Sequence, residues 1–372
     1  MATSVKKVAF VLPELGGGGA ERTFLNLVNH LDRATIAPLL VLYRRSGEYL
    51  PLVESDVEIM EIGCRRARHS IEPLRRLIGR VRPDLVVSTL QYVNVATVIA
   101  CRLAKGGARV AVRESNHQSA AGWKAMAPRS LGVRWAYNTA DGVIALSEGV
   151  RQDLRRRLGL SSDQVTTIYN PIDIREIEAQ AASAAPSIEG WTDAVGRLKI
   201  VTMGRLVPQK GFDLLIRAVS SLSIPWTLLI IGTGSQRERL AAVAREAGVE
   251  DRVHWAGFVE RPFPYIRSAD LFVLSSRWEG FGHVIAEAMV CGTPVLATRC
   301  PSGPDEIISD GVDGILCDVG SESALTRGIE SLGTDQDMRR RLASVAEESV
   351  RRFDVRTIAR RYESLFDRIW GG

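Results

Sequence analysis

The sequence alternates short apolar runs with longer amphipathic stretches, and this alternation starts twice along the chain. Apolar runs of strand length, each followed by a segment of helical spacing, are typical of βα units around a parallel sheet. In the first half the expected strands are 8–12, 39–43, 57–62, 85–88, 109–113, 143–146 and 165–169; in the second half they are 198–203, 226–231, 253–256, 271–274, 294–297 and 314–317. The pattern therefore predicts an α/β chain with two doubly wound parallel sheets.

A length of 372 residues also predicts two domains, because single cores stop growing beyond about 250–300 residues. The first domain is expected over 1–178, a linker rich in Ala and Ser over 179–197, and the second domain over 198–352. Residues 353–372 are expected to form a terminal helix that packs back on the first domain. Ligand sites lie at the carboxyl ends of such strands, so the domains are expected to face each other across a cleft.

Composition excludes several classes of protein. Hydrophobic residues make up 45% and charged residues 24%, which is typical of a globular protein and not of a disordered or collagen-like chain. The five cysteines form no CxxC pair and no cluster with histidine, so neither a zinc ribbon nor a disulfide framework is predicted. The apolar run after Lys6 and Lys7 is too short for a secretory signal, and the uncharged stretch 85–101 contains too many polar residues to span a bilayer. We therefore expect a cytoplasmic protein.

The net charge of +5 is distributed unevenly. Residues 1–185 contain 25 Lys and Arg against 18 Asp and Glu, whereas residues 186–372 contain 23 against 25. The densest basic segment, 64–82, has seven arginines and one acid, Glu72. Such a run is either a solvated helix face or a patch for a polyanion or an anionic membrane surface.

A glycine loop, Gly16, Gly17, Gly18 and Gly19, follows the first expected strand. Glycines at this position let the backbone approach a phosphate or a sugar at the positive end of a helix. A dinucleotide site would need an acid near the end of the second strand, where Tyr43, Arg44 and Arg45 stand instead. The loop is therefore either an anion-binding loop or only a tight turn.

A second loop, which contains Gly204, Arg205, Lys210 and Gly211, lies between an expected strand and an expected helix. Its two cations project from the carboxyl edge of the sheet. Cations at this edge can neutralise a diphosphate leaving group without a metal.

A third motif places two acids around a helix start. Glu279 lies on a loop, and Glu287 lies about 6 Å along the axis of a helix that begins near His283. The amides of Gly282 and His283 point between the two acids, an arrangement that suits a diphosphate flanked by two polyhydroxylated rings, as in a nucleotide sugar. The alternative is that the acids only complement the helix dipole. The D-x-D string at Asp335 is expected to cap a helix, so no metal is required.

With these motifs the sequence resembles the family 4 glycosyltransferases, which are retaining enzymes of the GT-B fold, with two facing Rossmann-like domains and a C-terminal helix. The family's E-x7-E motif is matched by Glu279 and Glu287, and its G-R-x4-K-G loop by Gly204, Arg205, Lys210 and Gly211. Its glycine-rich acceptor-side loop is matched by 16–19, and the resemblance extends from Val8 to the terminal helix.

The resemblance implies a role for each matching residue. Arg205 and Lys210 would hold the diphosphate, Glu287 the ribose and Glu279 the donor sugar. The other donor-binding residues would be Gly204, Gly232, Gly234, Phe258, Val259, Gly280, Phe281, Gly282 and His283. His117 resembles the family histidine that faces the sugar from the first domain, although a lone histidine after a strand is as often structural. The catalytic set would be Glu279, His117, Arg205 and Lys210.

The function implied is transfer of a hexose or N-acetylhexosamine from a nucleotide diphosphate sugar to a glycan, without a cofactor. The loop 300–306 resembles that of members which use UDP-sugars to build polysaccharides, O-antigen units or lipid-linked oligosaccharides. The expected partners are this donor, a glycan or lipid-linked glycan, and the inner face of an anionic membrane, but no nucleic acid. The alternatives are a non-hydrolysing UDP-sugar epimerase and a non-catalytic nucleotide-sugar-binding protein.

Overall fold

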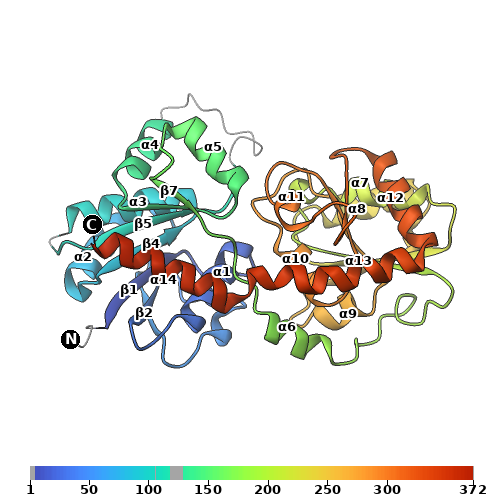
Figure 1. Ribbon diagram of the computed structural model, residues 1–372, viewed down its shortest axis with the longest axis horizontal. Coiled ribbons are helices and arrows are strands. Elements are labelled where there is room, and N and C mark those ends of the chain that lie inside the picture. The colour runs from blue at the N-terminus through green and yellow to red at the C-terminus, as the bar shows by residue number, and fades with distance from the viewer. Residues whose placement is uncertain (1–4, 105, 118–128, 372) are drawn as a thin grey trace. The chain divides into compact units, whose positions relative to one another are not determined.

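The computed structural model describes residues 5–104, 106–117 and 129–371, and these divide into two compact units (Figure 1). The first unit runs to Pro171 and resumes at Phe353, and the second covers Ile172–Arg352. Each unit has its own parallel sheet and its own apolar core.

Within the described residues, the first unit has a seven-stranded sheet of order β3-β2-β1-β4-β5-β6-β7. The strands are β1 Lys6–Leu12, β2 Ile36–Leu42, β3 Glu58–Glu61, β4 Leu85–Thr89, β5 Arg109–Glu114, β6 Gly142–Ala145 and β7 Val165–Thr167. The strand order reverses between β1 and β4, which pair with Val8 opposite Leu85. Ligands bind at the carboxyl ends of strands at such a reversal, and the glycine loop follows β1 there.

The helices of the first unit come from both ends of the chain. They are α1 Gly19–His30, α2 Ile71–Val81, α3 Gln91–Leu103, α4 Arg129–Thr139, α5 Glu148–Leu158 and α14 Val355–Gly371. The last of these, red in Figure 1, lies beside α1. Its buried side chains recur at helical spacing and join the core formed around β1: Ile358, Tyr362, Leu365, Phe366 and Ile369. The Phe366 ring lies 6.4 Å from that of Phe10.

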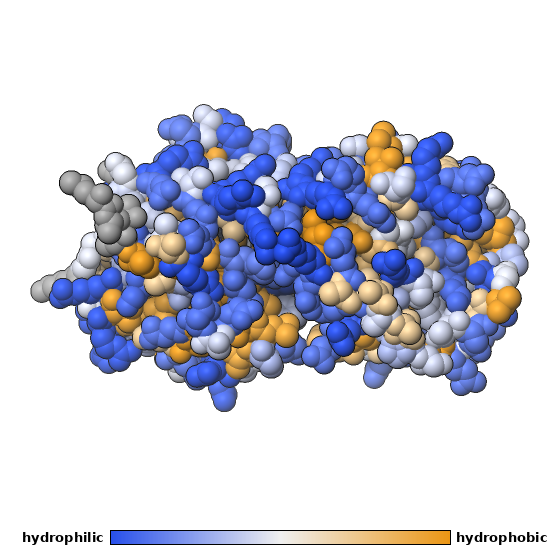
Figure 2. Space-filling view, turned by 60° about the horizontal axis from the view of Figure 1, so that its bottom comes forward, coloured by the Kyte–Doolittle hydropathy of each residue, from blue (hydrophilic) through white to orange (hydrophobic). Residues whose placement is uncertain are grey.

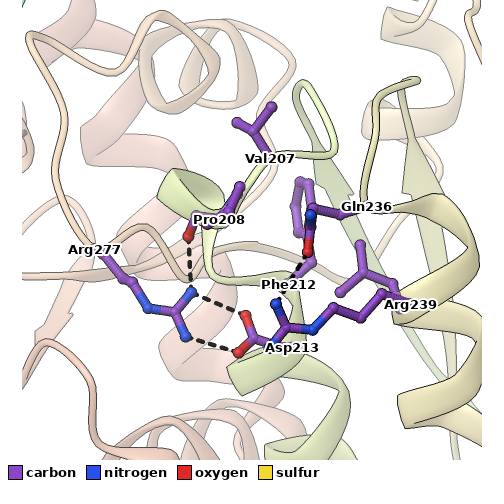
Figure 3. Close-up of a pocket in the computed structure, with 8 residues that line it drawn as sticks. Val207, Pro208, Phe212, Asp213, Gln236, Arg239 and Arg277 are labelled. Carbon is purple, nitrogen blue, oxygen red and sulfur yellow. Dashed lines mark hydrogen bonds and ion pairs between the residues drawn. The ribbon is translucent and has the colours of Figure 1, made fainter.

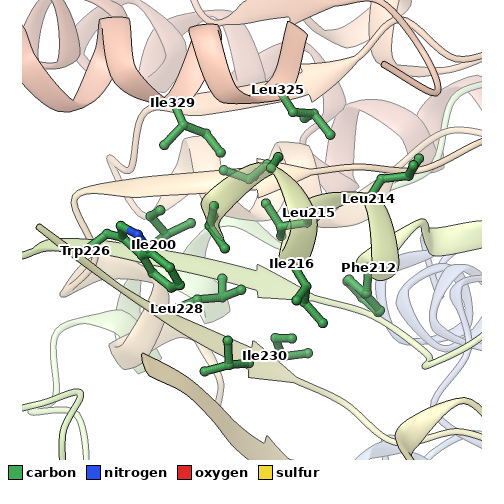
Figure 4. Packing of buried hydrophobic residues seen from close by; sticks show 14 of the residues in the cluster. Ile200, Phe212, Leu214, Leu215, Ile216, Trp226, Leu228, Ile230, Leu325 and Ile329 are labelled. Carbon is green, nitrogen blue, oxygen red and sulfur yellow. The ribbon is translucent and has the colours of Figure 1, made fainter. Parts of the chain in front are cut away.

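In the described part of the second unit, the sheet has six strands in the order β10-β9-β8-β11-β12-β13. The strands are β8 Leu198–Met203, β9 Trp226–Ile231, β10 Val253–Gly257, β11 Leu271–Leu274, β12 Val295–Thr298 and β13 Ile315–Cys317. The helices are α6 Ile174–Ala181, α7 Phe212–Ser220, α8 Arg237–Glu246, α9 Phe263–Arg267, α10 His283–Val290, α11 Pro304–Ile307, α12 Glu322–Thr334 and α13 Gln336–Ser349. Figure 4 shows side chains of α7 and α12 packed over β8 and β9, with Trp226 fully buried.

The sequence located every strand, with differences only at the ends. The largest difference is at β2, which begins at Ile36 and includes Pro38. Proline lacks an N–H for the ladder, but Pro38 pairs only with β1, because β3 pairs with β2 from Leu39 onward. Pro38 is therefore tolerated at a place where one side of the strand is an edge.

Two expectations about the domain boundaries need correction. The boundary lies after Pro171 and not at 178, and residues 179–197 are part of the second unit and not a linker. Helix α6 packs on α9 and α10, and Trp191 has only 1% of its surface exposed. The Ala- and Ser-rich composition hid this packing, because one buried tryptophan and the apolar face of a short helix are sufficient to attach the segment. The terminal helix α14 begins at Val355, close to the expected start, and the 3-10 turn Val350–Phe353 separates it from α13.

The packing of α14 predicts that Phe366→Ala destabilises the first unit. Phe366 is fully buried, and removing a buried phenylalanine costs about 3–5 kcal/mol in free energy of unfolding. Urea unfolding followed by tryptophan fluorescence measures the loss. Asp367→Ala, which changes the exposed neighbour, is the control and should leave the free energy of unfolding within about 0.5 kcal/mol of wild type. Equal effects of the two substitutions would contradict the assignment of α14 to this core.

Candidate active site

The sheet order of the second unit brings the expected donor-binding loops to one edge. Strand β8 pairs with β9 on one side and with β11 on the other. Because all three strands are parallel, their carboxyl ends lie together, and the loops that follow them are neighbours. These loops are 204–211 after β8, 232–236 after β9 and 275–282 after β11.

Lys210 and Glu279, from two of these loops, are in direct contact. The Nζ of Lys210 lies 2.6 Å from Oε1 of Glu279, and the hydroxyl of Ser276 donates to the same oxygen at 2.6 Å. Glu279 is only 5% exposed, and burial of an unpaired carboxylate would be costly. Lys210 and Ser276 therefore provide hydrogen-bond partners for the buried carboxylate of Glu279 and fix its position.

Glu287 lies inside α10, which begins at His283 as expected, and only 1% of its surface is exposed. The N-cap residue is Gly282, with φ of +96°, so no side chain covers the start of the helix there. The first amides of a helix lack intrahelical acceptors, and the helix dipole favours an anion in front of them. The start of α10 thus presents its first backbone amides three residues after Glu279.

The charges at this edge affect two buried thiols. Burial, followed by the charge of Glu279, raises the pKa of Cys300 to about 12. Burial and then the charge of Glu287 raise the pKa of Cys291 to about 12. Both thiols therefore remain neutral at physiological pH and add no charge to the site.

The remaining residues expected to bind the donor lie around this edge. Arg205 is exposed on the same loop as Lys210, and Phe258, which follows β10, is 51% exposed. The turn Gly232–Gly234 packs against the backbone of the β8 loop: the amide of Leu206 donates to Thr233 at 2.8 Å, and Gly204 donates to Ile231 at 2.9 Å. The other expected residues occupy these same loops and the start of α10: Val259, Gly280, Phe281 and His283.

The structure adds residues that the sequence motifs did not identify. Ser276 fixes Glu279, and Asp213 and Arg277 form an ion pair with two hydrogen bonds of 2.9 and 2.7 Å. Burial alone would raise the pKa of Asp213, but the hydrogen bonds and charge of Arg277 outweigh it and lower the pKa. Figure 3 shows this pair beside a small pocket lined by α7 and α8. Asp213 comes just after the loop 204–211 and Arg277 comes just before Glu279, so both residues lie outside the two motifs.

The residues expected on the acceptor side lie in the first unit. Gly16, Gly17 and Gly18 form the loop after β1, whereas Gly19 is already the first residue of α1. The amide of Gly17 donates to Glu48 at 2.9 Å. His117 follows β5, is 9% exposed, and has its Nδ1 4.0 Å from Oδ2 of Asp153. These residues all follow strands of the first sheet at the carboxyl edge.

Residues 5–104, 106–117 and 129–371 contain no group of three or more His, Cys, Asp or Glu placed to hold a metal ion. The same part of the chain contains no helix long and apolar enough to cross a membrane. Asp335 caps α13 as expected, since its side chain accepts a hydrogen bond from the amide of Met338 at 2.8 Å.

Comparison with known proteins identifies the class. Residues 17–176 match the model of glycosyltransferase family 4, and residues 189–349 match that of the glycosyl transferases group 1. The fold is GT-B: the chain superimposes on Anabaena HepE in complex with UDP with a TM-score of 0.82, at 23% identity over 97% of this chain and 99% of that one.

Two relatives align over nearly the whole chain. One is the Campylobacter jejuni N-acetylgalactosamine-N,N'-diacetylbacillosaminyl-diphospho-undecaprenol 4-alpha-N-acetylgalactosaminyltransferase, 25% identical over 96% of this chain and 98% of its own length. The other is the Rhizobium meliloti lipopolysaccharide core biosynthesis glycosyltransferase LpsD, 29% identical over 94% and 95%. The chain belongs to the family 4 glycosyltransferases.

The contact between the loop after β8 and the loop after β11 predicts that Gly211→Ala strongly destabilises the second unit. Gly211 has φ of +63°, and a Cβ there would collide with the carbonyl of Ser275. Gly248→Ala is the matched control, because Gly248 has φ of +68° with open space around it, so it bears only the left-handed strain of about 1–2 kcal/mol. In thermal unfolding we expect Gly211→Ala to lower the melting temperature clearly more than the control. Equal shifts would show that the loops are not in contact.

Proposed function

We propose that this glycosyltransferase moves a hexose or N-acetylhexosamine from a UDP-sugar to a glycan or lipid-linked glycan, with retention at the anomeric carbon and without a metal. The observation that carries the proposal is the contact of Lys210 with Glu279 at the carboxyl edge of the second sheet. In this proposal the cation would bind the diphosphate and the adjacent carboxylate would bind the sugar. The start of α10 lies beside them.

The hydrogen bonds of Glu279 support its role as a sugar ligand. Both donors to the carboxylate, Lys210 and Ser276, bind Oε1. Among the residues that the structure describes, none donates to Oε2, which can accept a hydrogen bond from a hydroxyl of the donor sugar. A carboxylate held in this way accepts sugar hydroxyls without rearrangement, which favours a defined orientation of the sugar.

Lys210 and Arg205 would bind the diphosphate. In the transfer step the bond between the anomeric carbon and the phosphate oxygen breaks, and a bond to the acceptor oxygen forms on the same face. The acceptor proton passes to the departing phosphate oxygen. The negative charge that develops on the diphosphate is largest in the transition state, so two cations placed there lower the barrier. Glu287 would bind the ribose hydroxyls, and His117 would contact the donor sugar.

The preference for UDP rests on the loop 300–306 and on its packing. The amide of Glu279 donates to the carbonyl of Pro301 at 3.4 Å, and the hydroxyl of Ser302 donates to that of Gly280 at 3.0 Å. The loop whose sequence is similar to that of UDP-sugar enzymes therefore supports the sugar-binding residues directly. HepE, which has the same fold, was solved with UDP.

Lys210→Gln tests the catalytic assignment. Glutamine retains a donor for Glu279 but removes the cation, so we expect kcat/KM to fall by about 10²–10³-fold. The assay measures transfer from radiolabelled UDP-glucose, UDP-galactose and their N-acetyl analogues to a lipid-linked glycan extract. Lys199→Gln is the control. Lys199 is a half-buried lysine of β8, the strand before the Lys210 loop, and among the described residues its Nζ donates to the carbonyl of Thr192. Near-normal transfer by a folded Lys210→Gln protein would refute the assignment.

The same assay separates the finer parts of the proposal. EDTA should leave transfer unchanged; a loss restored by Mg²⁺ or Mn²⁺ would overturn metal independence. Proton NMR of the product should show the anomeric configuration of the donor.

Incubation with UDP-N-acetylglucosamine alone should give no epimer, whereas an epimerised sugar would favour the epimerase alternative. Tight UDP binding with no transfer to any extract would favour a non-catalytic binding protein.

The basic segment 64–82 supports a place for the acceptor at an anionic membrane. Arg75 and Arg76 are both paired with Glu72, at 2.6 and 2.7 Å, so their charges are partly compensated. Five other arginines of this segment are exposed and have no acidic partner among the described residues: Arg65, Arg66, Arg68, Arg80 and Arg82.

Helix α4 adds exposed apolar side chains, Leu131 at 70% and Trp135 at 46%. Cations together with exposed apolar side chains are typical of a surface that binds anionic lipid. Trp123 and Lys124, which the sequence also suggested for this surface, lie outside the described residues. On the face shown in Figure 2, hydrophobic residues occur in separate patches among hydrophilic ones.

A flotation assay tests this surface. The triple variant Arg65→Gln, Arg66→Gln and Arg68→Gln should bind vesicles containing phosphatidylserine about 10²-fold more weakly than wild type at low salt, since each basic residue near such a surface contributes about 1 kcal/mol. The control Arg340→Gln, Arg341→Gln and Arg351→Gln makes the same change of charge in the second unit and should bind like wild type. Absence of wild-type binding would indicate a soluble acceptor.

A further inference from the structure

The loops that carry Lys210 and Glu279 are joined by several hydrogen bonds, most of them made by residues outside the motifs. The amide of Arg277 donates to the carbonyl of Gln209 at 2.8 Å, and the side-chain amide of Gln209 donates to the carbonyl of Trp278 at 2.9 Å. The hydroxyl of Ser275 donates to the carbonyl of Lys210 at 3.0 Å. Residues 209 and 210 of one loop are thus hydrogen-bonded to residues 275, 277 and 278 of the other, just before Glu279.

An ion pair closes this set of contacts. Arg277 donates through Nη1 to Oδ1 of Asp213 at 2.9 Å and through Nη2 to Oδ2 at 2.7 Å, and its Nη1 also donates to the carbonyl of Pro208 at 2.8 Å (Figure 3). A planar guanidinium that binds a carboxylate through two parallel bonds fixes the orientation of both groups. The side chains are 33% and 21% exposed, so the pair is partly shielded from water.

The ion pair of Asp213 and Arg277 connects a helix and a loop that are distant in the sequence. Asp213 follows Lys210 by three residues and lies in the first turn of α7, where its charge also complements the helix dipole. Arg277 precedes Glu279 by two residues on the loop after β11. The pair therefore ties the helix behind Lys210 to the loop in front of Glu279. Both Nη atoms of Arg277 donate hydrogen bonds, to Asp213 and to the carbonyl of Pro208, so the guanidinium is bound by these protein groups.

We propose that Asp213 and Arg277 are positioning residues that hold the loop of Lys210 against the loop of Glu279, and so place Lys210 for the diphosphate. The inference rests on the proposed function in one respect, which is that Lys210 binds the diphosphate. A cation on a loop free to move would bind phosphate less well, because part of the binding energy would be used to order the loop. Loss of the pair should therefore weaken recognition of the diphosphate but not of the nucleoside.

Asp213→Asn tests this role by titration of the protein with UDP and with uridine in a calorimeter. We expect UDP affinity to fall about tenfold, which is the weight of one charge-assisted hydrogen bond, while uridine affinity stays at the wild-type value. Arg277→Lys, which keeps the charge but loses the two-pronged geometry, should fall between wild type and Asp213→Asn. It also serves if Asp213→Asn does not fold.

Glu322→Gln is the matched control. It makes the same carboxylate-to-amide change and breaks the ion pair of α7 with α12, in which Nη1 of Arg217 lies 3.4 Å from Glu322, without touching either loop. This variant should bind UDP and uridine like wild type. The double variant Asp213→Asn with Arg277→Lys should weaken UDP binding by less than the product of the two single effects, because the residues act as one unit.

Three results would overturn the inference, and they are distinguishable. Unchanged UDP affinity in Asp213→Asn would show that the pair does not position Lys210. An equal loss of UDP and uridine affinity, with a lowered melting temperature, would show a structural role only. If wild type bound UDP no more tightly than uridine, the diphosphate assignment of Lys210 itself would fail, and with it this part of the proposed function.

Discussion

The need to compensate a buried carboxylate organises the site of this glycosyltransferase. Glu279 is 5% exposed, and an unpaired charge at that depth would be neutralised or would destabilise the fold. Its partner Lys210 lies 69 residues earlier and meets it at 2.6 Å. The ion pair forms because β8 and β11 are parallel neighbours, and it stabilises the loops only because other hydrogen bonds hold both backbones in place. In the proposed function, structural stability and donor recognition therefore depend on the same contacts.

The two units have similar parallel sheets but are built from the chain in different ways. The second unit is continuous in sequence, whereas the first needs the last helix to complete its core. Buried side chains of α14, such as Tyr362 and Phe366, contact apolar residues of the first strands, so the core of the first unit forms only when the end of the chain is in place. A contact between residues so distant in sequence has a high entropic cost of closure, and a large apolar surface offsets that cost.

Much of the fold could be predicted because the period of apolar residues reflects local geometry. The strand at Trp226–Ile231 and the helix start at His283 were located by pattern and by glycine alone. The boundaries were harder. The segment around Trp191 has the composition of a linker, yet it packs on the second sheet, because a few apolar contacts outweigh a polar composition. The interruption at Val350–Phe353 has no proline or glycine to indicate it.

The sequence by itself determined the fold, the motif residues and the charge asymmetry, because these depend on residue type and spacing. It also predicted that Lys210, Glu279 and Glu287 bind one ligand. Only the tertiary structure decided which atoms meet. The pairing of Asp213 with Arg277, the double donation to Oε1 of Glu279 and the attachment of residues 179–197 depend on strand order and side-chain direction. Residues 64 positions apart, such as Asp213 and Arg277, give no local signal of contact, since their proximity is produced by the sheet and not by the chain between them.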